Sequence, residues 1–310
     1  MKYRKLGNTG LDVSILSYGA SSLGSVFRAI NEKEGIRTVH EAVDRGINMI
    51  DVSPYYGLTK AETVLGKALK ELSRDSYFLS SKAGRYGDNT FDFSKRSIIK
   101  SAEESLKRLN TDYLDILLLH DIEFGHQDEV IDEGIEALIQ LKRQGKIRFF
   151  GVSALPLSIF EKIIEKTELD VILSYCHYSL NDTSLLSLLP KLEQNGIGLI
   201  NASPLSMGLL STNGPPTWHP ANEKIKEICK KALLHCKNKG ENLSKLAIQY
   251  AVQNERIPTT LVGTASAENI KRNIDWVNEP INKELLQEVL EILEPIHNQT
   301  WQSGAEEKSK

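Results

Sequence analysis

Four residues with reactive side chains lie at or near the ends of three apolar stretches in the first half of the chain. Asp51 and His120 close two of these stretches, Lys82 lies near the end of the third, and Tyr56 follows Asp51 by five residues. A carboxylate, a phenol, an ammonium and an imidazole together suit the interconversion of an alcohol and a carbonyl better than hydrolysis. The phenol would give or take the proton of the substrate oxygen.

Each of the four side chains can be given its own role in such a reaction. The ammonium of Lys82 favours the phenolate of Tyr56, so we expect it to lower a pKa that is ordinarily about 10. Asp51 would hold Lys82 charged and oriented, and His120 would bond the substrate oxygen and set its angle. Any one of them alone is more often a solvated or packed residue. The hypothesis depends on their occurring together at consecutive strand ends.

The elements that must position these residues alternate regularly along the chain. Stretches typical of strands cover residues 15–20, 48–52, 77–84, 114–120, 146–153, 170–177, 198–204 and 259–266. Stretches typical of helices cover 32–45, 60–72, 95–109 after a Ser94 cap, 132–144, a segment from about 157, one before Gly196, 223–239, 243–254, 267–276 and 282–293.

Eight strand-then-helix units in one rhythm predict an α/β protein, a single (β/α)8 TIM barrel in which the carboxyl ends of all strands meet at one rim. We treat 1–310 as one domain. It begins with a β-hairpin around Gly7–Gly10, ends with extra C-terminal helices, and has a disordered tail from about residue 303. The loop 207–222 is expected to be a lid. A doubly wound dinucleotide fold is the rival, but no G-x-G-x-x-G follows the first strand.

The composition limits the partners. The chain of 310 residues is 40% hydrophobic and 25% charged, with a formal net charge of −3. These values predict a soluble globular protein that binds a small molecule, and they give no reason to propose nucleic acid or a membrane. With no apolar N-terminal stretch, a cytoplasmic location is the default. The spacing of Cys229 and Cys236, with Cys176 in a predicted strand, suggests no disulfide, and we predict no metal site.

The motifs around the four residues resemble the aldo-keto reductase superfamily. "DVSPYYG", "SSKAG" and "LLLHD" are similar to its catalytic tetrad segments, and "GKIRFFGVS", "ASPLSMGLL" and "LVGTASAENIKRN" fit the same superfamily, so the resemblance spans about 3–276. It implies a barrel enzyme that uses NAD(P)(H) without a Rossmann motif. The tetrad would be Asp51, Tyr56, Lys82 and His120. A monomer is expected from the superfamily's habits.

Within the superfamily, four further segments resemble the plant-type L-galactose dehydrogenases. They are "GRY" before "FDFS", "HDIEFG", "DVILSYCHYSLND" and "GPPTWHPA". The resemblance implies oxidation of the anomeric hydroxyl of a free aldose, expected to be L-galactose, to its 1,4-lactone, a step of the ascorbate-biosynthesis type. For the sugar we expect Phe124, His177 and Trp218 beside Tyr56 and His120, since a sugar ring needs an aromatic surface and directed polar groups.

The resemblance also implies a cofactor site. Its expected residues are Ser153, Ser174, Ser203, Leu205, Gly208, Gly263, Thr264, Ser266, Asn269 and Asn273. Gly263 and Asn269 stand where members that prefer NADPH carry cations, so NAD is predicted over NADP, with Lys271 and Arg272 as the residues that could oppose this. Ala202 replaces the aromatic that usually stacks on the nicotinamide, and Tyr175 or Tyr178 could compensate.

Three alternatives remain open. The first is a barrel aldolase with Lys82 as a Schiff base, which a neighbouring Asp51 disfavours by keeping the ammonium charged. The second is an NADPH-dependent aldehyde or ketone reductase of the same superfamily. The third is a slow-turnover regulatory subunit that binds the cofactor, and turnover of sugars would discriminate it from a sugar dehydrogenase.

Overall fold

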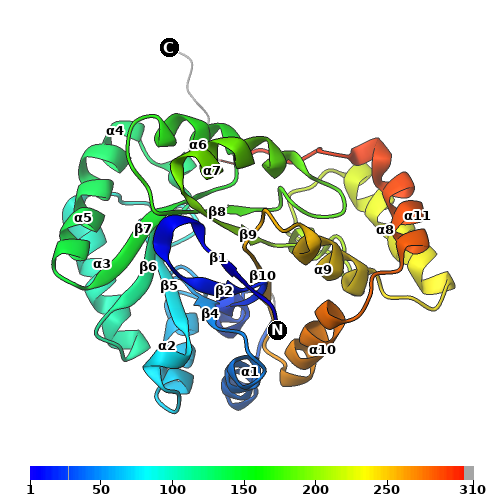
Figure 1. Ribbon diagram of the computed structural model, residues 1–310, viewed down its shortest axis with the longest axis horizontal. Coiled ribbons are helices and arrows are strands. Elements are labelled where there is room, and N and C mark those ends of the chain that lie inside the picture. Colours follow the sequence, from blue (N-terminus) through cyan, green and yellow to red (C-terminus); the bar gives the residue numbers. More distant parts are fainter. Residues whose placement is uncertain (27, 304–310) are drawn as a thin grey trace.

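The centre of the protein is a closed barrel of eight parallel strands, seen in a computed structural model that describes residues 1–26 and 28–303 (Figure 1). The strands are β3 (Leu16–Gly19), β4 (Met49–Asp51), β5 (Phe78–Ala83), β6 (Leu114–Leu119), β7 (Ile147–Ala154), β8 (Val171–Tyr175), β9 (Gly198–Ala202) and β10 (Thr259–Gly263). They follow one another in chain order, and β10 pairs with β3 to close the ring. The predicted (β/α)8 barrel is confirmed, and the doubly wound rival is wrong.

Helices surround this barrel. After successive strands come α1 (Glu32–Asp44), α2 (Lys60–Leu69), α3 (Lys95–Leu109), α5 (Glu136–Arg143), α6 (Leu157–Ile164), α7 (Leu189–Asn195), α9 (Leu243–Gln253) and α10 (Ala267–Asn278). The additional helices α8 (Glu223–Asn238) and α11 (Lys283–Leu293) pack together at the side of the barrel (Figure 1). The expected cap of α3 is present, since Ser94 accepts a hydrogen bond from the amide of Ser97.

The predicted N-terminal hairpin closes one end of the barrel. Its strands β1 (Tyr3–Lys5) and β2 (Asp12–Ser14) pair antiparallel, and a 3-10 turn joins them. Leu6, Leu11 and Val13 are buried in one cluster with side chains that fill the barrel interior, such as Met49 and Leu118. Because the hairpin covers the amino ends of the strands, chemistry is left to the opposite rim.

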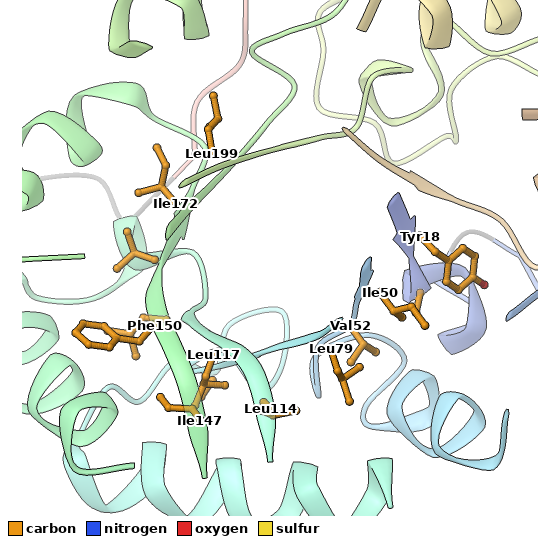
Figure 2. Close-up of a cluster of buried hydrophobic side chains, with 14 of the residues drawn as sticks. Tyr18, Ile50, Val52, Leu79, Leu114, Leu117, Ile147, Phe150, Ile172 and Leu199 are labelled. Atoms are coloured by element: carbon orange, nitrogen blue, oxygen red, sulfur yellow. The ribbon is translucent and has the colours of Figure 1, made fainter. Parts of the chain in front are cut away.

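Alternation along the strands decides which side chains reach the barrel interior. Ile50, Val52, Leu79, Leu117 and Ile172 belong to the layer between strands and helices, which Figure 2 shows outside the barrel wall. Residues between them on the same strands point the other way, because successive side chains of a strand alternate between its faces. This periodicity directs Asp51 of β4 and Lys82 of β5 into the barrel.

At the rim, a residue just after each of several strands adopts the left-handed backbone conformation. Gly84 after β5 has φ 102°, Asp121 after β6 has φ 53°, Cys176 after β8 has φ 65°, and Ser203 after β9 has φ 58°. Predicted strands through His177 and residue 204 were therefore too long, because the chain turns at these points. Residues other than glycine that adopt this backbone conformation cluster at functional sites.

Further boundaries differ from the prediction, and the strand expected over 259–266 ends at Gly263. The helix expected over 132–144 begins earlier, as α4 (Gln127–Glu129), and continues through a π-helical segment, Val130–Ile135, into α5. Periodicity does not reveal such a π segment, because it inserts a wider turn into an otherwise regular helix. Of the predicted tail, Ser303 is placed, and residues 304–310 lie outside the described residues.

Part of the expected lid, 207–222, packs against the rest of the protein. After the 3-10 turn Ser206–Gly208 it forms no further helix or strand before Glu223, and Leu209, Leu210 and Ala221 pack in the cluster of α8 and α11. All three cysteines are free, as expected. Over residues 1–26 and 28–303, no helix has the length and apolar character needed to cross a membrane.

Candidate active site

Asp51 and Lys82 form a buried ion pair at the rim. They come from neighbouring strands, on which Asp51 lies opposite Ser80. Lys82 Nζ contacts the Asp51 carboxylate and donates to the Val52 carbonyl at 3.1 Å, while Ser80 Oγ donates to the other Asp51 oxygen at 2.8 Å. Burial acts against the charged form of Lys82, but Asp51 and Tyr56 outweigh it and raise the Lys82 pKa. The predicted pairing is present, and a raised pKa argues against a Schiff-base lysine.

Tyr56 is brought over this pair by a tight loop between β4 and α2. Gly57 has φ 64°, and a Cβ there would meet the Gly24 carbonyl oxygen at 2.0 Å. Only glycine permits both this conformation and this approach. The loop therefore rests on the 3-10 segment Ala20–Gly24 and places the Tyr56 ring with its centroid 4.9 Å from Lys82 Nζ.

The pKa of Tyr56 differs from the prediction. Burial of the phenol raises it, and the charge and hydrogen bond of Lys82 lower it without cancelling the effect of burial. The expected nearness of a lysine predicts only the second contribution, because burial depends on the folded loop. In the free protein the phenol is therefore protonated at neutral pH.

His120 stands beside Tyr56 as a neutral imidazole. Its ring centroid is 5.6 Å from that of Tyr56, in an edge arrangement at 85°. Burial lowers the His120 pKa well below its ordinary value, and Lys82 and Arg85 lower it further. Ser53 Oγ accepts the amide hydrogen of Tyr55 at 3.1 Å and lies 2.9 Å from His120 Nδ1. The Ser53 hydroxyl can donate to Nδ1 in the His120 tautomer that carries the ring hydrogen on Nε2.

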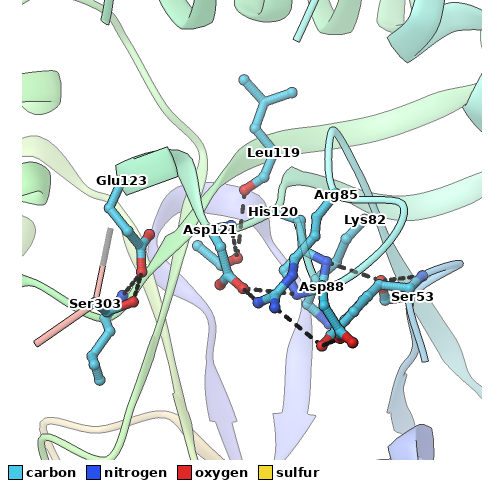
Figure 3. Close-up of polar contacts among 12 residues, drawn as sticks. Ser53, Lys82, Arg85, Asp88, Leu119, His120, Asp121, Glu123 and Ser303 are labelled. Atoms are coloured by element: carbon cyan, nitrogen blue, oxygen red, sulfur yellow. Dashed lines mark hydrogen bonds and ion pairs between the residues drawn. The ribbon is translucent and has the colours of Figure 1, made fainter. Parts of the chain in front are cut away.

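A second charged pair, which the sequence did not reveal, adjoins His120 (Figure 3). Arg85 donates to the Asp121 carboxylate at 2.5 Å and to the Tyr55 hydroxyl at 3.0 Å. Asp121 Oδ2 also lies 3.7 Å from His120 Nε2. Burial raises the pKa of Asp121 and Arg85 opposes this. The signal that could have found the pair is position, since Asp121 follows His120 directly and Arg85 follows Lys82 by three residues.

Glu123 is a further acidic residue near this pair. It is 8% exposed, and its Oε1 accepts from the Leu155 amide at 3.1 Å and from the Ser303 hydroxyl at 2.9 Å (Figure 3). No partner for its Oε2 is found within the described part of the chain. Burial, followed by the charge of Asp121, raises the pKa of Glu123 to about 7.

This raised pKa makes stability depend on pH. Below the ordinary pKa of 4.5, both folded and unfolded chains carry a protonated Glu123 and no penalty arises. As pH rises from there through about 7, the unfolded chain ionises first and stability is lost. Glu123→Gln should therefore raise the free energy of unfolding by on the order of 3 kcal/mol at pH 8 and change it little at pH 4. Urea unfolding at both pH values, with the exposed Glu227→Gln as control, measures this; equal effects at both would contradict it.

The predicted cofactor residues lie mainly along one side of the rim. Ser203, Leu205 and Gly208 follow β9, and Gly263 and Thr264 stand at the end of β10. Ser266 caps α10, Asn269 lies in its first turn and Asn273 in its second. The strands β9 and β10 are neighbours in the barrel. Ser153, on β7, instead accepts the Asp121 amide at 3.1 Å. Its hydroxyl thus holds the backbone of the residue after His120.

Ser174 is turned away from this rim. On β8, Leu173 and Tyr175 pack with the barrel interior, whereas Ile172 lies in the outer layer (Figure 2), so Ser174 faces the helices. Its hydroxyl is fully buried and lacks a hydrogen-bond partner among the described residues. Tyr175 reaches the site and bonds Asp121. Tyr178 stacks on Tyr250 of α9 at 5.6 Å, so it packs in the core.

The three predicted sugar residues are spread around the mouth. Phe124 stacks on Phe91 at 4.5 Å, and the pair borders the Arg85 guanidinium. His177 is buried, with Nδ1 2.9 Å from the Ser184 hydroxyl. Trp218 is 52% exposed on the loop 207–222. Of the three, Phe124 lies nearest to the charged pair that adjoins His120, through its contact with Arg85.

The protein is a parallel eight-stranded barrel that is closed at one end by an N-terminal hairpin and has Asp, Tyr, Lys and His at its open rim. This combination defines the class of barrel oxidoreductases that carry this tetrad. The sequence pattern of the Aldo/keto reductase family matches residues 15–294, and the chain belongs to this family.

Known proteins of related sequence or structure are similar to nearly all or most of this chain. The chain is 49% identical to the L-galactose dehydrogenase of Arabidopsis thaliana over 98% of each protein. It is 35% identical to the D-arabinose 1-dehydrogenase of Saccharomyces cerevisiae, over 76% of this chain and 73% of that one. Among solved structures, the holo form of an aldo-keto reductase of Bacillus halodurans superposes with a TM-score of 0.79, at 27% identity and over 99% of both chains.

Proposed function

We propose that the protein oxidises the anomeric hydroxyl of a free aldose, L-galactose above all, to the lactone, with NAD as the electron acceptor. The observation that carries this proposal is the rim itself, where Tyr56, Lys82 and a neutral His120 converge on one point. Similarity over nearly the whole chain to an L-galactose dehydrogenase, and over three quarters of it to an arabinose 1-dehydrogenase, supports the substrate class.

The chain's residues divide the work of this oxidation. His120 donates from Nε2 to the anomeric oxygen and fixes its position, and Tyr56, in the molecules in which it is ionised to the phenolate, takes the proton of that oxygen as the carbonyl forms. Lys82 stabilises the negative charge that Tyr56 must carry to act as a base, and Asp51 keeps Lys82 charged. The bound nicotinamide supplies the acceptor for the hydride that leaves C1.

The residues after β10 fit a dinucleotide. A Cβ on Gly263 would meet the Gly19 carbonyl oxygen at 3.2 Å and the hydroxyls of Ser21 and Ser22 at 3.4 Å. The absence of a side chain at Gly263 therefore lets its backbone lie close to two hydroxyl groups that can donate hydrogen bonds. The start of α10 follows directly, capped by Ser266. The hydroxyl groups of Ser21 and Ser22 suit phosphate groups, and members of this family bind nicotinamide cofactors.

Three charges near the start of α10 bear on the choice between NAD and NADP. Glu34 of α1 accepts the Ala267 amide at 2.9 Å and pairs with the exposed Arg37 at 2.9 Å. The bond from the amide, and then Arg37, lower the Glu34 pKa, so a carboxylate occupies the helix N-terminus. Arg272 contacts the Asn269 side chain, so one cation does approach the predicted phosphate position. We propose that Glu34 disfavours a 2′-phosphate and that NAD is preferred.

We expect kcat/KM with NAD to exceed that with NADP by about 10-fold or more, the value of a charged hydrogen bond that the phosphate does not gain. Glu34→Gln keeps an oxygen for the Ala267 amide and removes the charge, so it should tighten NADP binding about five-fold at low salt and leave NAD binding unchanged. Fluorescence titration with both cofactors, with Glu32→Gln as the matched control on α1, checks this. Stronger binding of NADP by the unchanged protein would contradict the preference.

A panel of free aldoses tests the proposed function. The protein is incubated with NAD or NADP and each sugar, including both enantiomers of galactose, and formation of the reduced cofactor is followed. We expect L-galactose with NAD to give the highest kcat/KM. Turnover only in the reductive direction, with aldehydes and NADPH, would replace the proposal by a general aldehyde reductase, which the nearness of Arg272 to Asn269 would then explain.

A further inference from the structure

The pair Arg85 and Asp121 has no part in the proton transfer described above, yet it lies against the reacting group. Asp121 is 3% exposed and follows His120 directly in the chain. Its Oδ2 is 3.7 Å from His120 Nε2, which is too far for a direct hydrogen bond. The carboxylate therefore stands beside the nitrogen that faces the substrate oxygen, without being bonded to it.

The backbone and three side chains hold Asp121 in this place. Its φ of 53° is in the left-handed region, and its amide donates to Ser153 Oγ at 3.1 Å. Arg85 donates to its carboxylate at 2.5 Å, and Tyr175 makes a further hydrogen bond with it. Figure 3 shows the Asp121 carboxylate facing the Arg85 guanidinium, to which dashed lines join it. A carboxylate has roughly four acceptor positions, so these two side-chain donors leave capacity for another.

A sugar offers a donor for that position. Neighbouring hydroxyl oxygens on a sugar ring lie about a hydrogen-bond length apart. If His120 Nε2 bonds the anomeric oxygen O1, the carboxylate 3.7 Å from Nε2 lies within reach of the hydroxyl on the adjacent carbon, O2. O2 still carries its proton, and an ionised Asp121 can only accept, so the two groups are complementary.

We propose that Asp121, held by Arg85, is a binding residue for the 2-hydroxyl of the sugar and makes the enzyme select aldoses that carry one. The inference rests on the proposed function, because it uses the same position of O1 at His120. It assigns Arg85 as a positioning residue that acts through Asp121. Simple aldehydes and 2-deoxy sugars have no hydroxyl on the carbon next to C1. When they bind, the buried Asp121 carboxylate would lack that hydrogen-bond donor.

The test compares L-galactose, 2-deoxy-L-galactose and 6-deoxy-L-galactose. For the unchanged protein, kcat/KM for the 2-deoxy sugar should be roughly 10- to 100-fold lower than for L-galactose, the value of one hydrogen bond to a charged group. The 6-deoxy sugar keeps O2 and should stay close to L-galactose. The 2-hydroxyl withdraws electrons from C1, so its loss makes hydride departure from the sugar intrinsically easier. A lower kcat/KM for the 2-deoxy sugar would therefore reflect a contact with the protein that this sugar cannot make.

Asp121→Asn should reduce this discrimination to a few-fold, by slowing L-galactose and not by speeding the 2-deoxy sugar. Asp88→Asn is the matched control and should keep the full ratio, because Asp88 is an exposed carboxylate on the loop after β5 that accepts from the Tyr55 hydroxyl. Thermal unfolding of both variants checks that they fold; if Asp121→Asn does not, the comparison of sugars with the unchanged protein still decides. Equal kcat/KM for L-galactose and its 2-deoxy form overturns the inference and leaves the proposed function standing, whereas no turnover of any aldose overturns both.

Discussion

Replacing Tyr56 with phenylalanine is expected to lower kcat for sugar oxidation by about 10²- to 10⁴-fold, the usual contribution of one positioned proton-transfer group. The phenol is the group that can take the proton of the anomeric oxygen, and Lys82 sits 4.9 Å from its ring centroid to stabilise its charged form. Phenylalanine keeps the ring and its edge contact with His120, so substrate and cofactor binding should change little. Steady-state kinetics with L-galactose and fluorescence titration of the cofactor measure the two effects separately.

The matched control for this variant is Tyr86→Phe. Tyr86 lies on the loop after β5, and its hydroxyl accepts from the Ser97 hydroxyl and from the Gly84 amide, each at 3.2 Å, contacts that involve none of the four tetrad side chains. Its loss should leave kcat within a few-fold of the unchanged protein. If Tyr56→Phe retained most of its rate, or lost it only through weaker cofactor binding, Tyr56 would have no role as the proton acceptor.

Replacing Lys82 with methionine should affect both stability and activity. Lys82 is 1% exposed and Asp51 is 3% exposed, so the variant leaves a carboxylate buried without its cation. Loss of one member of a buried pair typically costs about 3–5 kcal/mol. Activity should fall by about 10²-fold or more, because nothing then offsets the effect of burial on the Tyr56 pKa. Urea unfolding at pH 7 and steady-state kinetics are the measurements.

The double variant Asp51→Asn with Lys82→Met separates these two effects. It removes the uncompensated charge, and the amide oxygen introduced in place of the carboxylate can still accept from Ser80, so much of the lost stability should return. Activity should not return, since Tyr56 remains without an ammonium. A double variant as unstable as the single one would show that the buried charge is not the cause of the destabilisation.

The tetrad could be predicted from the sequence because it depends on one rule. Residues at the carboxyl ends of parallel strands converge, so Asp51, Lys82 and His120 needed only correct strands and the order of the barrel. The rule tolerates errors of one or two residues in the strand ends. It therefore held although predicted strands ran too far at residues 177 and 204.

What depends on side-chain direction was harder to predict. Ser174 was expected at the cofactor because it stands where many members of the superfamily carry Gln. A shift of one residue turns a strand side chain to the other face, and Tyr175 is the residue that reaches the site. Ser53, Arg85 and Asp121 were missed because their contacts come from left-handed exits and loop packing at the rim. Neither feature has a periodic signal in the sequence.

The raised Tyr56 pKa has a similar cause. Proximity of a lysine can be inferred from strand order, but burial of the phenol arises from the close approach of Gly24 and Gly57, which only the folded loop makes visible. Burial and charge act in opposite directions on the phenol. Sequence reasoning could therefore name the groups involved and still assign the wrong net direction.

The central claim is that the protein moves the hydrogen on the anomeric carbon of an aldose to a nicotinamide. The most direct measurement uses L-galactose deuterated at C1 with NAD, followed by mass spectrometry of both products. We predict that the deuterium appears in the reduced cofactor, in equal amount to a lactone that has lost it. Lactone that forms while the reduced cofactor carries no deuterium, or reduction of aldehydes by NADPH with no labelled cofactor formed from the sugar, would contradict the account.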